Sequence, residues 1–191
     1  MRICVAWALI AAVVTTSCAT ARRPRSGPRV TPFGFGSPAT EEQIRAWDID
    51  VRPDGKGLPA GRGTVAQGAS IYAEKCAACH GERGRNGPFE PLVGRVAEGF
   101  PFGRDPSLKR TVGSYWPYAT TLFDYMRRAM PWMSPGSLQD DEVYALVAYI
   151  LHLNEIVPED AVMDADSLAR VVMPAHDRFV RDNRRGGREI R

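Results

Sequence analysis

Cysteine and histidine are scarce in this sequence, which holds four cysteines and three histidines among 191 residues. Cys4 and Cys18 lie near the N-terminus, so Cys76 and Cys79 form the single C-x-x-C pair. A structural zinc site of the common cysteine-rich kind needs a second pair. The sequence therefore argues against a zinc module.

Long apolar runs and a strong excess of charge are also missing. The apolar stretch at residues 3–14 is too short to span a bilayer stably, and a hydrophobic content of 44% is typical of a soluble globular protein. The formal net charge of +3 gives no support to nucleic-acid binding. One domain of ordinary size with extensions is expected from this length.

Residues 76–80, in contrast, form a C-x-x-C-H motif. Two thiols at helical i, i+3 spacing reach the two vinyl groups on one edge of a porphyrin, and the adjoining imidazole then lies under the iron. The motif predicts one covalently bound haem c, attached through Cys76 and Cys79, with His80 as an iron ligand. A ligating histidine usually donates its second ring N–H to a backbone carbonyl, and the carbonyl of Pro91 is the expected acceptor.

The N-terminus has the charged start and apolar middle of a secretory signal, which predicts export. Two cleavage sites remain open. Ala-Thr-Ala at residues 19–21 fits a soluble product with a signal peptide over residues 1–21. Thr-Thr-Ser-Cys at residues 15–18 resembles a lipobox, which would give a lipoprotein signal over residues 1–17 and a lipid anchor at Cys18.

The rest of the chain predicts a helical domain between two extensions. Residues 22–63 are rich in Pro and Gly and form an arm, with a short helix at 41–47. Further helices are expected at about 64–78, where Gly68 and Tyr72 would pack on another helix, at 119–129, and from an N-cap at Ser137 to about residue 153. The haem domain then covers residues 64–154, and residues 155–191 form an irregular tail.

Tyr115, Trp116 and Tyr118 cluster beside Pro117. Aromatic side chains can pack against a large flat ligand or form a docking patch for a partner. We expect Tyr115 and Trp116 to pack against the haem.

Several of these motifs resemble the class I cytochromes c. The resemblance rests on the G-x-x-x-Y-x-x-x-C-A-A-C-H-G pattern at 68–81, Pro-Leu-Val-Gly at 91–94, Met-Pro at 130–131 and the terminal helix with its acidic start. It implies an all-α class I cytochrome c fold with an extended N-terminal arm and a C-terminal tail, and His/Met axial ligation of the iron. Met130 is the expected ligand by its place in the motif and Met133 is its rival among the available methionines, which also include Met126, Met163 and Met173.

A more specific resemblance involves residues 47–55, 111–121 and 141–154. These stretches are similar to the cytochrome subunit of the Sox-type sulfite (sulfane) dehydrogenase, whose partner is a molybdenum-cofactor subunit of the sulfite oxidase type. Members of that family carry two haem domains in a longer chain, whereas this sequence has one haem motif.

This resemblance implies a periplasmic monohaem cytochrome, soluble or lipid-anchored, that accepts electrons from the molybdenum subunit during sulfur oxidation and passes them to a downstream acceptor. Such a chain would be the non-catalytic, electron-transfer subunit of an oxidoreductase. Two alternatives remain open. One is a free-standing electron shuttle, and the other is a haem enzyme such as a peroxidase or a thiosulfate-oxidising cytochrome.

Overall fold

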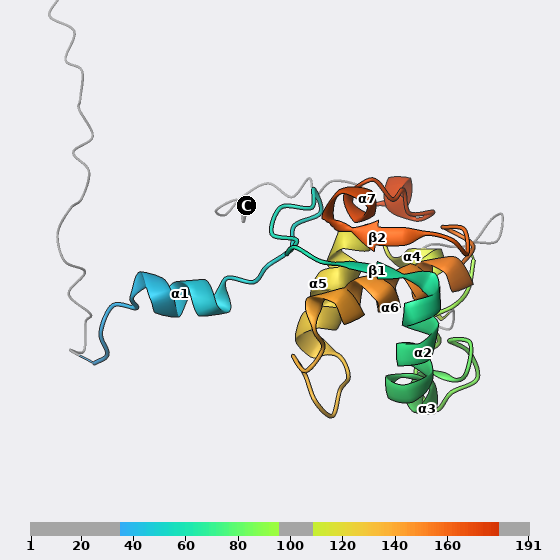
Figure 1. The fold of residues 1–191 in the computed structure, drawn as a ribbon, viewed down its shortest axis with the longest axis horizontal. Coiled ribbons are helices and arrows are strands. Elements are labelled where there is room, and N and C mark those ends of the chain that lie inside the picture. The colour runs from blue at the N-terminus through green and yellow to red at the C-terminus, as the bar shows by residue number, and fades with distance from the viewer. Residues whose placement is uncertain (1–34, 96–108, 180–191) are drawn as a thin grey trace, which may run out of the picture. The chain divides into compact units, whose positions relative to one another are not determined.

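The computed structural model of this chain describes residues 35–95 and 109–179 (Figure 1). The predicted signal peptide, Cys18 and the first part of the arm lie outside these ranges, as does the end of the predicted tail. Contacts divide the chain into two units, with the boundary after Thr40. All the helices and strands of the described ranges belong to the second unit.

The second unit is mostly helical. Its elements are, in chain order, α1 (Glu41–Trp47), β1 (Arg62–Thr64), α2 (Val65–Lys75), α3 (Ala77–His80), α4 (Val112–Tyr115), α5 (Ala119–Ala129), α6 (Asp140–Leu153), β2 (Val162–Asp164), α7 (Ala165–Ala169) and a 3-10 turn (His176–Arg178). This architecture agrees with the predicted all-α class, with one addition: β1 and β2 pair as a small antiparallel sheet.

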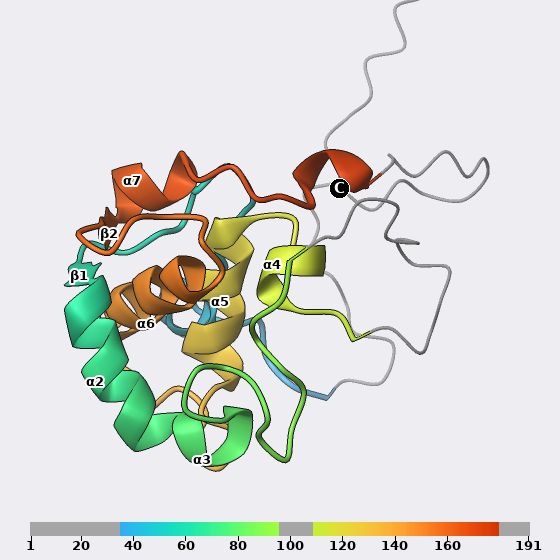
Figure 2. The same cartoon turned by 90° about the vertical axis from the view of Figure 1, so that its right-hand side faces the viewer.

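Helix α6 is the centre of the domain, with α2 and α5 packed against it (Figures 1 and 2). Six consecutive α6 residues, 143–148, are buried. A helix covered on several sides must be apolar over most of its circumference, which explains why this segment consists of Val, Tyr, Ala and Leu.

The crossing of α2 and α6 depends on Gly68. A Cβ atom at Gly68 would overlap the carbonyl oxygen of Ala145 and would lie 2.7 Å from Cβ of Tyr149. Tyr72, one turn later, is fully buried, and its ring centroid lies 5.3 Å from that of Tyr149. The prediction that this helix face packs closely on another helix is confirmed.

Some of the predicted helix bounds agree with the structure and others do not. The bounds predicted for α1 and α5 are confirmed. The single helix predicted over 64–78 is wrong, because the backbone leaves helical geometry at Cys76 (φ −125°, ψ −33°) and α3 begins after it. The predicted N-cap Ser137 is also wrong: α6 is capped by Gln139, whose N–H donates to Glu142 Oε2 at 2.9 Å.

The segment after α6 is more ordered than predicted. An irregular tail was expected, but this segment provides β2 and α7, and it contributes Met163, Leu168 and Met173 to the buried core. The apolar residues are too few and too widely spaced to show a period in the sequence. Pairing with β1, about a hundred residues earlier in the chain, organises them.

The last part of the predicted arm also packs against the helices. Val51 is buried. Thr120 donates to the carbonyl of Pro53 at 3.1 Å, and Tyr144 donates to the carbonyl of Pro59 at 2.8 Å. These contacts join residues 51–59 to α5 and α6.

Candidate haem site

Cys76, Cys79 and His80 lie on one tight turn at the end of α2. The Cys76 N–H donates to the Tyr72 carbonyl at 2.9 Å and so completes α2. The N–H groups of Cys79 and His80 both donate to the Cys76 carbonyl, at 3.1 and 3.0 Å. Both thiols are free, with Cys76 half-buried and Cys79 exposed. The turn therefore presents two thiols beside one imidazole.

The thiol of Cys76 is neutral at physiological pH. Burial raises its pKa to about 11, with a smaller opposing effect from Lys75. Among the described residues, no group of three or more His, Cys, Asp or Glu side chains could hold a metal ion by itself.

The ring of His80 is oriented by a backbone carbonyl. Its Nδ1 lies 2.9 Å from the carbonyl oxygen of Glu90. A carbonyl can only accept, so Nδ1 is the donor, and in the neutral imidazole Nε2 then has the lone pair that an iron ligand needs. The predicted acceptor, Pro91, is wrong by one residue, because the loop turns back earlier than the sequence indicates.

Backbone hydrogen bonds hold this loop beside the C-x-x-C-H turn. The Phe89 N–H donates to the Cys79 carbonyl at 3.1 Å, and the Leu92 N–H donates to the Gly84 carbonyl at 2.9 Å. The buried hydroxyl of Tyr72 donates to the Gly81 carbonyl at 3.0 Å. Together these bonds place Glu90 next to the histidine.

Met130 is the methionine whose environment best suits an axial ligand. It caps the C-terminus of α5, is half-buried and packs against the hydrophobic core. Its rival Met133 is 87% exposed, whereas Met126 is buried on the core side of α5. Figures 1 and 2 both place α3 and the end of α5 at the same end of the domain. Ligation by Met130 stays a prediction, which its half-buried position supports.

Tyr115 and Trp116 have partners within the protein. The ring of Tyr115 is stacked under the guanidinium of Arg110 at 4.8 Å. Trp116 packs against the core, and its indole N–H donates to the hydroxyl of Thr121 at 3.0 Å. Packing of the two rings against a haem stays a prediction.

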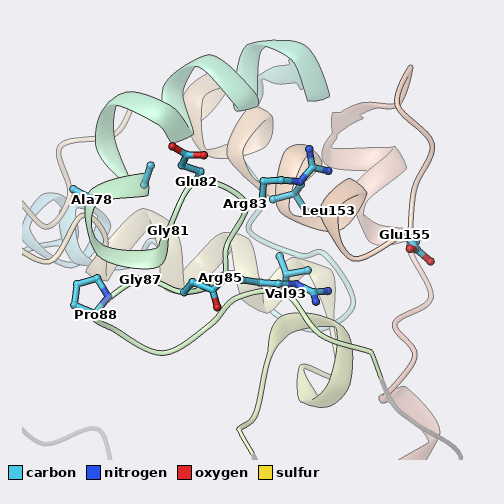
Figure 3. Close-up of a pocket in the computed structure, with 12 residues that line it drawn as sticks. Ala78, Gly81, Glu82, Arg83, Arg85, Gly87, Pro88, Val93, Leu153 and Glu155 are labelled. Carbon is cyan, nitrogen blue, oxygen red and sulfur yellow. The ribbon is translucent and has the colours of Figure 1, made fainter.

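An open cleft of about 760 Å³ lies next to the C-x-x-C-H turn (Figure 3). Residues of the following loop line it, among them Glu82, Arg83 and Arg85, together with Ala77 and Ala78, the two middle residues of the motif. Neither thiol, nor His80, nor Met130 is part of its lining.

A family model described as cytochrome c oxidase, cbb3-type, subunit III, matches residues 63–150. The crystal structure of the sulfane dehydrogenase SoxCD from Paracoccus pantotrophus matches this fold with a TM-score of 0.69 and 38% sequence identity, over 78% of this chain and 72% of that one. This chain belongs to the cytochrome c family. The predicted class I cytochrome c fold is confirmed, as is the similarity to the Sox-type sulfane dehydrogenase.

Two further relatives of this cytochrome are longer proteins, of which it matches only a part. The cbb3-type cytochrome c oxidase subunit CcoP of Azospirillum sp. (strain B510) is 29% identical over 135 residues, which make up 69% of this chain and 42% of that protein. The thiosulfate dehydrogenase of Stutzerimonas stutzeri (strain A1501) is 30% identical over 98 residues, or 48% of this chain and 28% of that protein. The cytochrome spans less than half the length of either relative.

Membership of the family implies haem c and a role in electron transfer, and the donor set fits that group. The turn offers two thiols and an imidazole with a free Nε2, and Met130 offers a half-buried thioether. When bound, a haem supplies an iron that changes its charge by one electron. Every helix within the described ranges is too short or too polar to cross a membrane.

Proposed function

We propose that this cytochrome is a periplasmic, monohaem, electron-accepting subunit of a molybdenum-containing sulfite or sulfane dehydrogenase. The observation that carries the proposal is the similarity to SoxCD, which extends over 78% of the chain and so well beyond residues 63–150 matched by the general family model. The shared region therefore includes segments outside the haem domain. Electrons would pass from the molybdenum subunit to this chain and then to a downstream acceptor.

In this proposal one haem is attached covalently to Cys76 and Cys79, and its iron is held by His80 and Met130. An iron with both axial positions occupied has no open site for a substrate. The oxidation of sulfite or sulfane sulfur must then take place on another cofactor, and this chain accepts the electrons one at a time. Within the described part of the chain, Cys76 and Cys79 are the only cysteines, so no thiolate is left to replace a ligand.

The loop after Met130 offers an apolar docking surface for that partner. Trp132 is 74% exposed and Met133 is 87% exposed, so neither side chain belongs to the core. Residues 131–137 carry no charged side chain. Exposed aromatic and Met side chains without charge are typical of the centre of a stable interface, whereas a diffusing shuttle gains most from charge that steers its encounters. This surface favours a fixed subunit over a free-standing shuttle.

The proposal places the cytochrome in the periplasm because of its predicted signal, with Cys18 as a lipid anchor if the lipobox is used. Neither cleavage site changes the redox chemistry. Mass spectrometry of the mature N-terminus distinguishes an acylated Cys18 from cleavage after Ala21.

Stopped-flow reduction tests the electron path. The cytochrome alone, mixed with sulfite or a sulfane sulfur compound, should stay oxidised, and it should be reduced rapidly once the molybdenum subunit is added. Trp132→Ala should slow this reduction, because truncation of a buried interface aromatic commonly costs about 2 kcal/mol of binding. Trp47→Ala is the matched control, since Trp47 is a comparably exposed tryptophan (86%) on α1.

Two results would redirect the assignment. Rapid reduction by substrate in the absence of any partner would favour a haem enzyme, and reduction by thiosulfate would connect it to the relative named thiosulfate dehydrogenase. Failure of reduction even with the molybdenum subunit present would favour the free-standing shuttle.

A further inference from the structure

The last turn of α5, immediately before Met130, is tied to α6 by an ion pair. Arg127 Nε lies 2.8 Å from Oδ1 of Asp140, the first residue of α6. Both side chains are largely covered, with exposures of 21% and 32%. The pair closes the base of the loop over residues 130–139, so it fixes the end of α5 relative to the start of α6.

The neighbouring arginine ties the same turn to a different part of the chain. Arg128 pairs with Asp50 at 2.9 Å and with Asp124, one turn earlier on α5. The carboxylate of Asp124 is buried and also accepts the N–H of Val51 at 2.9 Å. This second set of contacts holds the turn against residues 50–51.

Met130 depends on that turn for its position. Its backbone is already extended (φ −120°, ψ 147°), and its own link to the helix is the bond from its N–H to the Met126 carbonyl at 3.1 Å. The residues that follow it, Trp132 and Met133, are exposed and supply no packing. Besides the packing of Met130 against the core, the location of the thioether is therefore set by the helix end that precedes it.

We infer that Arg127 and Arg128 are positioning residues that hold the Met130 thioether where an axial ligand must lie. The inference rests on the assignment of Met130 under the proposed function. A thioether competes for iron with water and added bases, and it stays bound only if the protein keeps it close to the metal. Removal of a residue that orients a metal ligand typically weakens the binding of the metal by about 10- to 100-fold.

Imidazole binding to the ferric, haem-loaded cytochrome measures how readily the thioether leaves. Arg127→Gln and Arg128→Gln each remove a charge while keeping a long polar side chain, and each should raise the affinity for imidazole about 10-fold, with a larger effect in the double variant. Arg127→Lys keeps the charge and should bind imidazole much as the wild type does. Met130→Ala sets the upper limit of the effect.

Lys75→Gln is the control for a purely structural role. It breaks the pair between Lys75 Nζ and Glu142 at 2.6 Å, which joins α2 to α6 and is similarly covered, with exposures of 30% and 26%. This variant should lower the melting temperature as the arginine variants do, yet leave imidazole affinity unchanged.

Three results would overturn the inference. The first is a fall in melting temperature without a change in imidazole affinity in the arginine variants, and the second is an equal rise in affinity in Lys75→Gln. The third is unaltered imidazole binding in Met130→Ala, which would remove Met130 as the ligand. The titration uses no molybdenum subunit, so its outcome is independent of whether that partner reduces the cytochrome.

Discussion

The two sides of the candidate haem site are built in different ways. The histidine side, residues 76–93, is held by backbone hydrogen bonds between residues close in sequence, such as Phe89 to Cys79 and Leu92 to Gly84. The methionine side is held by side-chain ion pairs that join α5 to α6 and to Asp50. One side is held mainly by contacts within its own segment, and the other depends on segments that are distant in the chain.

This difference has consequences for how each side tolerates change. Backbone bonds do not depend on side-chain charge, so the histidine side should be insensitive to salt. Partly exposed ion pairs are weakened by screening and by loss of either partner. We therefore expect covalent and steric changes to have the largest effects on the histidine side, and charge changes to act mainly on the methionine side.

The largest effect is expected from Cys76→Ser combined with Cys79→Ser. Without the two thiols no thioether links can form, and the helices lose the apolar group on which they pack. The double variant should yield little folded protein and no haem that remains on the chain in a denaturing gel. Acidified organic solvent should fail to extract haem from the wild type, and its extraction would contradict covalent attachment.

Met130→Ala tests the methionine side directly. Loss of a soft thioether ligand should lower the reduction potential and open the iron to exogenous ligands. The long-wavelength thioether charge-transfer band should disappear. Met133→Ala should retain the band, because that side chain is 87% exposed. The reverse pattern would assign the ligand to Met133.

Gly68→Ala should destabilise the domain by about 3 kcal/mol, because the added methyl group would overlap the backbone of Ala145 and force α2 away from α6. Chemical denaturation gives the change in the free energy of unfolding. Ala66→Ser, at an exposed position of the same helix, should change stability by no more than about 0.5 kcal/mol. Equal stability of the two variants would show that α2 and α6 can move apart at Gly68 without loss of stability.

The smallest effect is expected from alkaline pH, which acts on two buried tyrosines. Burial raises the pKa of Tyr72 and of Tyr144 from 10.0 to about 12. A raised folded-state pKa gives stability that is fully present below the unfolded value and is lost as pH rises through the folded value. Stability should thus fall between pH 10 and about 12, by roughly 1–2 kcal/mol for each residue.

Tyr72→Phe and Tyr144→Phe should each flatten this alkaline loss in urea unfolding measured across that pH range. Tyr72 bonds to the histidine side through the Gly81 carbonyl, whereas Tyr144 bonds to the Pro59 carbonyl. Only Tyr72→Phe should also alter the haem spectrum. An unchanged pH profile in both variants would show that other groups control alkaline unfolding.

Sequence alone determined those features that depend on neighbouring residues. The C-x-x-C-H motif, the bounds of α1 and α5, and the close packing at Gly68 follow from spacing, helix periodicity and the missing side chain of glycine. The cytochrome c fold could be predicted because the motifs at residues 68–81, 91–94 and 130–131 resemble those of the class I cytochromes c. Each is a local property of the chain.

Only the tertiary structure decided which distant groups meet. The path of the loop places the carbonyl of Glu90, and not that of Pro91, within hydrogen-bond distance of His80 Nδ1. Pairing with β1 gave the C-terminal segment a strand. The ion pairs of Arg127 and Arg128 reach partners 13 and 78 residues away, and several other acidic residues were equally plausible from the sequence. Such contacts depend on how whole helices pack, which no local pattern of charge or hydrophobicity specifies.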